Sequence, residues 1–389
     1  MPLKKKKAAK KKILNNVWLY ITATIVALIP QFYIRSSEKI TYYLFGRFRT
    51  YPGDLWYCWS HYLSKGFPYP REYPSGIQML FSFLFRIMPK DFNYDKYAVC
   101  VSVFFGTFAV LTTYILFMVS KSSGTNPVKI LVLWIFAPSF LFYGLYNVDF
   151  LCVFLIMAAY YLFVEEEYYL SAAILALGTS IKVFPIFLAP LFFFSAPRKV
   201  RFGSVASFIF VWLLFNVPFM VRNWEAWVFP FEWQINENFA KSATDGSYWW
   251  IFHKYLGFGG KLIGRLSLIL FGGLYFYFVK RYKHLSLTRK CAIVMFLFLL
   301  TDRINSPQYN LYLLPFLAVA DYKVDLRFFY LAEIPNVIYV MFMFFFKDNP
   351  EFYPGLYLQG LVLLKYISLI VLFYKNIQNP IATGGKTAS

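Results

Sequence analysis

Long apolar blocks dominate this chain and restrict what it can fold into. They run to roughly 15–22 residues, about the length at which an α-helix crosses a hydrocarbon core of about 30 Å. A transmembrane β-barrel would show short segments of alternating hydrophobicity instead. Only 15% of the 389 residues are charged, against about 25% in soluble domains. The sequence therefore predicts an all-α polytopic membrane protein.

About twelve membrane helices are expected from the positions of these blocks. Several blocks are short, so we expect the corresponding helices to be tilted or shielded by their neighbours. The predicted ranges are 13–34, 97–119, 130–147, 149–164, 168–181, 184–196, 203–222, 259–279, 291–302, 308–320, 328–346 and 356–374.

The distribution of basic residues predicts the orientation of these helices. The N-terminal segment "MPLKKKKAAKKK" precedes an apolar run without a small-residue cleavage site, which is typical of an uncleaved signal-anchor with a cytoplasmic tail at 1–12. Connections that then lie inside include "KSSGTNPVK", "SAPRKVR", "KRYKHLSLTRK" and "DYKVDLR", and most of them are basic. An even number of crossings makes the C-terminus cytoplasmic too. The net charge of +20 is then chiefly the cytoplasmic excess of Lys and Arg, and no soluble basic domain is left to bind nucleic acid.

Two long loops, 35–96 and 223–258, fall on the outer side in this topology. Within the first loop, "IQMLFSFLFRIM" (77–88) is too short to span and predicts an interfacial or re-entrant helix. The same loop carries many Lys and Arg residues. They form either a solvated surface facing lipid headgroups or a site for an anionic group such as phosphate, which Arg binds in bidentate fashion. The four cysteines lack the spacing of a metal site.

Asp54 is the only acidic residue between Glu38 and Glu72, and it stands among aromatic residues that include Trp56 and Tyr57. Such rings either anchor the loop at the membrane interface or stack on sugars. A carboxylate enclosed by rings loses water and becomes a stronger base. The alternative is an ordinary loop aspartate or a helix cap.

Two further charged residues interrupt apolar sequence at predicted outer ends. Asp149 in "GLYNVDFLC" is either a functional ionisable residue in the membrane or a helix N-cap. Lys182 in "ALGTSIKVFPIFLAP" has a nearby carboxylate or a substrate phosphate as its natural partner, unless it extends to the surface.

A third polar group lies in "LLTDRINSPQYNLYLLP". Asp302 and Arg303 either pair with each other or line a polar pocket with Gln308 and Tyr309. His253 in "SYWWIFHKY" is the histidine best placed to contact a phosphate or a hydroxyl, although a lone loop histidine often has no role.

The chain contains no P-loop, GxSxG, HExxH or dinucleotide-binding fingerprint. It resembles instead the GT-C class of membrane glycosyltransferases, and most closely the polyprenyl-phosphate-mannose-dependent mannosyltransferases of glycosyltransferase family 87. The segments that carry this resemblance are "YPGDLWYCW", "FPYPREYPSG", "GLYNVDFL", "LGTSIKVFPIFLAPLFFF" and "SPQYNLYLLPF".

The resemblance implies a single inverting glycosyltransferase domain over 1–389 with a GT-C-like arrangement, in which 35–96 is the catalytic outer loop. By position, Asp54 would be the base that accepts the acceptor's proton. The donor phosphate would be bound by Lys182, Arg303, Arg71 and His253, and the sugar or acceptor by Asp149, Asp302, Gln308, Trp56, Tyr57 and Glu72.

The resemblance also bears on cofactors and partners. No DxD or ExD pair is present in the first loop, so we expect no metal and no other cofactor. The expected partners are a polyprenyl-phosphate sugar, a lipid, glycan or protein acceptor and membrane lipids, and the chain is expected to be a monomer. The alternative function is a transporter or flippase for a lipid-linked or amphiphilic substrate, but such proteins gather their charges near mid-membrane on broken helices.

Overall fold

The computed structural model of the chain describes residues 16–35, 54–88, 93–235, 246–346 and 356–378. Within these ranges it is helical and contains no strand. In chain order the elements are α2 (Val17–Arg35), α4 (Asp54–His61), η1 (Leu63–Lys65), α5 (Ser75–Ile87), α6 (Tyr94–Ser122), α7 (Val128–Ile130), the π-helical η2 (Leu131–Ile135), α8 (Pro138–Tyr143), α9 (Asp149–Val164), α10 (Tyr168–Ile181), η3 (Phe184–Phe187), α11 (Ala189–Ser195), α12 (Arg198–Arg222), α13 (Trp224–Ile235), α14 (Trp249–Leu256), α15 (Gly260–Arg281), α16 (Leu287–Thr301), η4 (Pro307–Tyr312), α17 (Leu314–Ala318), α18 (Leu326–Phe346) and α19 (Leu356–Gln378).

Five of the described helices are long and apolar enough to cross a membrane. They span Val17–Arg35, Tyr94–Ser122, Arg198–Arg222, Gly260–Arg281 and Tyr357–Gln378. The membrane character expected from the apolar blocks is therefore confirmed, whereas the total of about twelve crossings stays a prediction. The helix expected at 77–88 corresponds to α5, and its position at a membrane surface also stays a prediction.

Three predicted spans are broken at proline residues. The segment 130–147 divides before Pro138 into η2 and α8, and a turn follows α8. The segments 184–196 and 308–320 divide in the same way into a 3₁₀ turn and a short helix, with Pro190 and Pro315 at the starts of α11 and α17. Proline lacks an N–H and disfavours helical conformation in the residue before it. If these segments lie within the bilayer as predicted, their irregular backbone must face protein or a water-filled cavity, because lipid cannot satisfy its polar groups.

Both predicted outer loops contain helices among their described residues. The first holds α4 and α5, and the second holds α13 and α14. Helix α5 packs on α10 and α12, where Ser75 Oγ donates a hydrogen bond of 2.8 Å to Asn216 Oδ1. A Cβ atom at Gly76 would lie 2.7 Å from the carbonyl oxygen of Ser180. Glycine at this position therefore permits the close approach of α5 to the end of α10.

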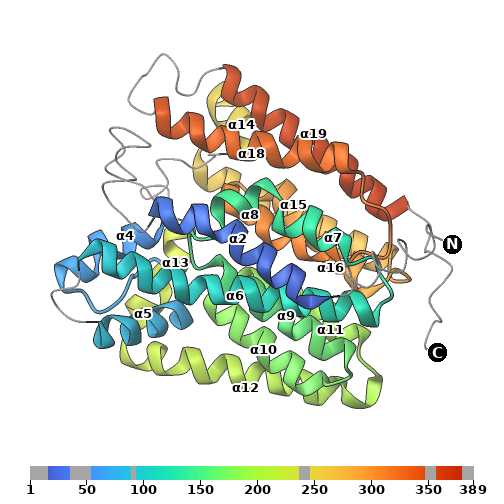
Figure 1. The fold of residues 1–389 in the computed structure, drawn as a ribbon, viewed down its shortest axis with the longest axis horizontal. Coiled ribbons are helices and arrows are strands. Elements are labelled where there is room, and N and C mark those ends of the chain that lie inside the picture. Colours follow the sequence, from blue (N-terminus) through green and yellow to red (C-terminus); the bar gives the residue numbers. More distant parts are fainter. Residues whose placement is uncertain (1–15, 36–53, 89–92, 236–245, 347–355, 379–389) are drawn as a thin grey trace, which may run out of the picture.

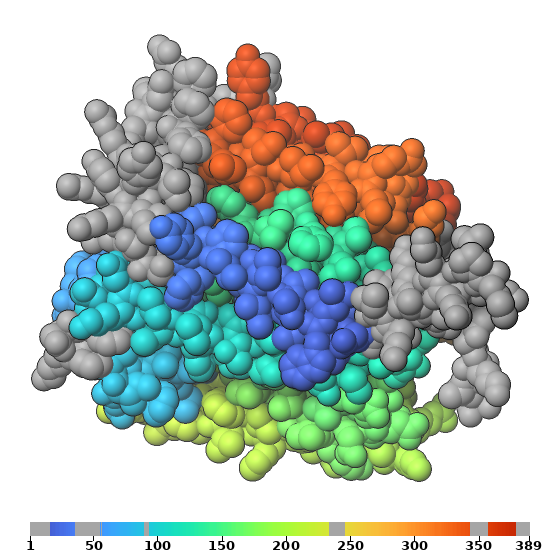
Figure 2. Space-filling model, in the orientation of Figure 1, coloured from blue at the N-terminus to red at the C-terminus, as the bar shows by residue number. Residues whose placement is uncertain are grey.

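The helices surround a core built on α9, which packs against α6 and α10. In Figure 1, α12 lies along the lower edge of the bundle and α18 and α19 run side by side along its upper edge. Figure 2 shows α2 as a blue band across the visible face, with α6 below it. The core is rich in large rings such as Trp134, Phe150 and Phe296, which are fully buried, and the van der Waals contacts of such rings help to hold membrane helices together.

The predicted orientation can be tested by cysteine labelling in a variant without native cysteines. Both Glu232, at the end of α13, and Lys283, after α15, are exposed. In intact cells, a membrane-impermeant thiol reagent should label Glu232→Cys from outside and Lys283→Cys only after permeabilisation, because charged segments do not exchange sides of a bilayer. Labelling of Lys283→Cys in intact cells would invert the predicted topology.

Candidate functional site

Asp149, Lys182 and Tyr312 form a polar cluster with a buried carboxylate at its centre. Asp149 is the first residue of α9 and its side chain is 0% exposed. Its Oδ1 atom lies 3.1 Å from Lys182 Nζ and accepts a hydrogen bond from the Tyr312 hydroxyl. The N-cap of α9 is Val148, so Asp149 is not the cap that one interpretation of the sequence expected. The N-terminal end of the helix nevertheless favours its negative charge.

Lys182 occupies the C-cap position of α10, and its side chain is 16% exposed. The ammonium group lies 5.9 Å from the ring centre of Tyr73 and 5.8 Å from that of Tyr309. The ammonium group is therefore close to two aromatic rings, an attractive arrangement for a cation. The sequence left open whether Lys182 faces a carboxylate, a substrate phosphate or the surface, and the structure pairs it with Asp149.

The second carboxylate oxygen of Asp149 is available for another interaction. Oδ2 is buried and accepts no hydrogen bond from the described residues. A buried acceptor without a donor is unfavourable. A further hydrogen-bond donor at Oδ2 would remove that penalty.

Asp54 is the first residue of α4. Its side chain and that of Trp56 lie outside the described part of the structure. The next residue, Leu55, donates its backbone N–H to the carbonyl oxygen of Tyr146 over 3.4 Å. Tyr146 belongs to the turn that leads into Asp149. The backbone of Asp54 therefore lies beside the Asp149 turn, although the two residues are far apart in sequence.

The end of α2 holds this turn from one side. Arg35 Nη2 donates to the carbonyl oxygen of Phe142 over 2.8 Å, and its guanidinium lies 5.6 Å from the ring centre of Tyr146. The amide of Gln31 bonds to the backbone of the same segment, donating to Phe140 O and accepting from Leu145 N, both over 2.9 Å. The sequence analysis included Arg35 only as one of the many Lys and Arg residues of the predicted 35–96 loop and missed Gln31. An Arg and a Gln four residues apart on one helix face were the available signal.

Tyr57, Arg71 and Glu72 are three predicted site residues of the first loop. Tyr57 contacts Glu72, and Arg71 precedes Glu72 in the chain. The Tyr57 hydroxyl donates to Glu72 Oε1 over 2.8 Å. Arg71 is exposed, with its guanidinium 6.0 Å from the ring centre of Phe67. Tyr57 and Glu72 thus bind each other, and the described contacts join neither of them to Asp149.

A cavity of about 340 Å³ opens beside the cluster, between η3, α15 and α16. Its lining residues are Phe187, Lys261, Gly264, Arg265, Ser267, Leu268, Phe271, Phe298, Asp302 and Arg303. Asp302 and Arg303 were predicted site residues, and both line this cavity. The side chain of Arg303 lies against Gly264, where an added Cβ would come within 3.4 Å of its Nε.

Contacting aromatic rings link the cavity to the Asp149–Lys182 pair. Phe298 lines the cavity, and its ring centre lies 5.5 Å from that of Tyr309, whose ring centre lies 5.8 Å from Lys182 Nζ. The ring of Phe184 lies 4.1 Å from that of Tyr312, which contacts Asp149. The two polar regions are therefore neighbours.

The cavity-lining face of α15 is cationic at its N-terminal end and apolar further along the helix. Lys261 and Arg265 lie at its N-terminal end, and Leu268 and Phe271 follow one and two turns later. Both cations are exposed. This order, cationic and then apolar, complements a molecule with an anionic head and an apolar tail. Sequence reasoning missed Lys261 and Arg265, although their spacing of four residues is a helical one.

The two remaining predicted residues differ in their burial. His253 is exposed, and its Nδ1 lies 2.9 Å from the carbonyl oxygen of Phe258, just past the end of its own helix. Gln308 is buried within η4. Among the described residues, His253 forms no hydrogen bond or ion pair with Asp149 or Lys182.

Comparison with known proteins places the chain in a family. Residues 73–301, more than half of the chain, match glycosyltransferase family 87. The matched region includes Tyr73, Asp149 and Lys182. Neither the curated proteins nor the solved structures yielded a match. The chain therefore belongs to glycosyltransferase family 87 and is a membrane glycosyltransferase.

Proposed function

We propose that this protein transfers mannose from a polyprenyl-phosphate donor to a hydroxyl group of an acceptor on the extracytoplasmic side. The acceptor is a lipid, a glycan or a protein. The observation that carries the proposal is the cavity beside α15, which is cationic near Lys261, Arg265 and Arg303 and apolar beyond them. A lipid phosphate needs both environments in this order, since its head is anionic and its tail is a hydrocarbon.

The proposed chemistry is a single displacement at the anomeric carbon. Asp54 accepts the proton of the acceptor hydroxyl as its oxygen bonds to that carbon. The bond from the carbon to the phosphate oxygen breaks, and polyprenyl phosphate leaves with the bonding electrons. Attack opposite the leaving group inverts the configuration. Arg303, Lys261 and Arg265 stabilise the charge that grows on the phosphate.

The Asp149–Lys182 pair has a positioning role in this proposal. Tyr312 and Lys182 both contact Asp149 Oδ1, so the carboxylate is held while its Oδ2 remains without a donor among the described residues. A hydroxyl of the acceptor or sugar donates to Oδ2. Held geometry of this kind accelerates a reaction because the reacting groups need not be ordered at the moment of reaction.

The experiment that tests the function uses purified full-length protein in detergent or nanodiscs. It is given labelled polyprenyl-phosphate mannose, with membranes that supply acceptors, and in parallel a labelled nucleotide mannose. Label should pass to an acceptor only from the lipid phosphate, and equally fast with and without a chelator of divalent metals. Transfer from the nucleotide sugar alone would overturn the donor assignment, and loss of activity with chelator would overturn metal independence.

Arg303→Gln should raise the KM for the lipid-phosphate donor by roughly 10–100-fold, because the phosphate loses a charge-assisted contact of roughly 1.5–3 kcal/mol. The value of kcat should fall as well, because the charge that Arg303 stabilises on the leaving phosphate grows in the transition state. Steady-state kinetics over a donor titration measures both. Arg281→Gln, at the other end of α15 and exposed, is the matched control and should leave KM unchanged. An unchanged KM in Arg303→Gln would exclude this cavity as the phosphate site.

A further inference from the structure

The 302–312 segment connects the two polar regions of the site. Asp302 and Arg303 line the cavity, whereas Tyr309 and Tyr312 contact Lys182 and Asp149. The segment comprises an irregular stretch and the 3₁₀ helix η4. A 3₁₀ helix has weaker hydrogen-bond geometry than an α-helix. Contacts from elsewhere are therefore needed to hold Tyr312 in place.

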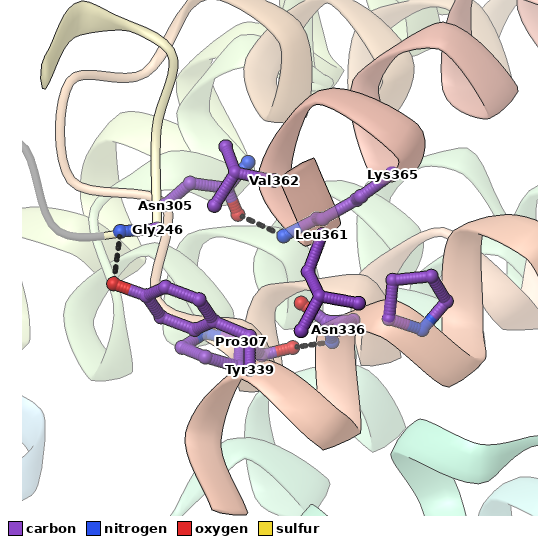
Figure 3. A pocket seen from close by; sticks show the side chains of 9 residues that line it. Gly246, Asn305, Pro307, Asn336, Tyr339, Leu361, Val362 and Lys365 are labelled. Carbon is purple, nitrogen blue, oxygen red and sulfur yellow. Dashed lines mark hydrogen bonds between the residues drawn. The ribbon is translucent and has the colours of Figure 1, made fainter. Parts of the chain in front are cut away.

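Buried polar side chains of α18 and α19 hold the segment. Glu333 Oε1 accepts a hydrogen bond of 2.7 Å from Asn310 Nδ2. Asn336 Nδ2 donates to the carbonyl oxygen of Pro307 over 2.7 Å, and Lys365 Nζ donates to Asn305 Oδ1 over 3.1 Å. Figure 3 shows both of the last two contacts around a pocket of only about 10 Å³, which leaves little space for the segment to move.

Glu333 also holds the other side of the site. Its Oε2 atom accepts the backbone N–H of Ser139 over 2.9 Å, at the start of α8. Helix α8 leads directly into the turn before Asp149. One carboxylate therefore joins the element that carries Tyr312 to the element that leads to Asp149.

Packing alone does not explain a charge at this position. Glu333 and Lys365 are each only 3% exposed, and apolar side chains of similar volume usually fill such positions at no loss of stability. A carboxylate has two acceptor oxygens and can accept from Ser139 and Asn310 together, whereas an amide has one. Both α18 and α19 lie beyond the region matched to the family, which ends at residue 301.

We propose that Glu333 is a positioning residue that sets the Tyr312–Asp149 contact by fixing α8 and the 302–312 segment relative to each other. The kinetic part of this inference rests on the proposed function. Glu333 acts through Asn310 and Ser139 and is not a catalytic residue.

A role exchange between Glu333 and Asn310 tests the proposal. Asn310→Asp places two carboxylates against each other, displaces η4 and should lower kcat by about 10²-fold, the effect of a misplacement of about 1 Å. KM for the donor should change less, because Arg303 lies seven residues before Asn310 and its side chain packs against Gly264 of α15. Glu333→Gln should cost less than Asn310→Asp. Its carbonyl oxygen still accepts from Ser139. Once the Asn310 amide rotates to exchange its N and O positions, the new NH₂ group can donate to Asn310 Oδ1, which in the wild type is buried without a donor among the described residues.

Combined with Asn310→Asp, Glu333→Gln should restore kcat to within about threefold of the Glu333→Gln single variant, because its NH₂ group then donates to the new carboxylate. Tyr160→Phe is the matched control. It removes a buried hydrogen bond of 2.5 Å to Thr288 near the opposite end of α9 and should lower the thermal midpoint without lowering kcat. The proposal would be overturned if the kcat losses of the two single variants multiplied in the double variant. It would also be overturned if Tyr160→Phe lowered kcat as much as Asn310→Asp does.

Hydrogen exchange is a second measurement, and it does not depend on transferase activity. Hydrogen exchange of peptides covering 302–312 should be faster in Asn310→Asp and return towards the wild-type rate in the double variant, because exchange reports local opening. If wild-type protein transfers no sugar from the lipid phosphate, the proposed function fails while this comparison still tests the contact. Unaltered exchange in Asn310→Asp would refute the positioning role itself.

Discussion

Asp54→Asn should fold and bind donor, yet transfer sugar at least about 10²–10⁴-fold more slowly, the contribution usual for a general base. An amide has the shape of the carboxylate but cannot accept the acceptor's proton. The backbone contact from Leu55 to Tyr146 does not involve the altered group, so α4 should stay beside the Asp149 turn. Asparagine also caps helices as well as aspartate does, so loss of a cap would not explain the effect.

The assay is transfer from synthetic polyprenyl-phosphate mannose, with donor binding measured separately. Asp95→Asn is the matched control, because Asp95 is an exposed carboxylate in the first turn of α6. Its rate should equal that of wild type. Asp149→Asn should reduce the chemical step less than Asp54→Asn. Full activity in Asp54→Asn with none in Asp149→Asn would move the base role to Asp149, and full activity in both would remove carboxylate catalysis.

Lys182→Ala should lower the free energy of unfolding by about 3–5 kcal/mol, because it leaves the buried carboxylate of Asp149 without its cation. It should also weaken use of the donor strongly, since Asp149 is then held by Tyr312 alone. Adding Asp149→Asn should recover part of the lost stability but none of the activity, as the uncompensated charge is then gone. Thermal unfolding in detergent and donor kinetics measure the two effects.

Lys182→Arg should not restore activity. A guanidinium is planar and wider than an ammonium, and the space at Lys182 is bounded by Tyr73 and Tyr309. Lys290→Ala is the matched control, since Lys290 is half-buried and bonds to Ser195 away from Asp149. Wild-type stability and donor use in Lys182→Ala would instead support a lysine that merely extends to the surface.

Local sequence patterns predicted several elements closely. The ranges 149–164 and 168–181 agree with α9 and α10, because a continuous apolar run bounded by polar residues determines a buried helix locally. The same criterion failed for 130–147, where Pro138 interrupts the run. Hydropathy alone does not register a broken helix, because the residues on both sides of the proline are equally apolar.

The candidate site was only partly accessible from sequence. Asp149 and Lys182 stood out as charges in apolar surroundings, but their pairing at 3.1 Å joins two different helices. Glu333 and Lys365 were missed, although each is an isolated charge within an apolar helix, which is itself a signal of function. Lys261 and Arg265 gain their meaning only from the cavity that they line.

The sequence by itself determined that the chain is a helical membrane protein of glycosyltransferase family 87, because hydrophobic length and short motifs are local properties. Only the tertiary structure decided which polar groups meet. Asp149, Lys182 and Tyr312 come from three separate elements, and Glu333 reaches two more. Helix packing fixes which faces oppose each other, and that depends on side chains along the whole length of every contact. The partners of a buried charge are therefore set by the assembled bundle and cannot be read from the residues beside it in the chain.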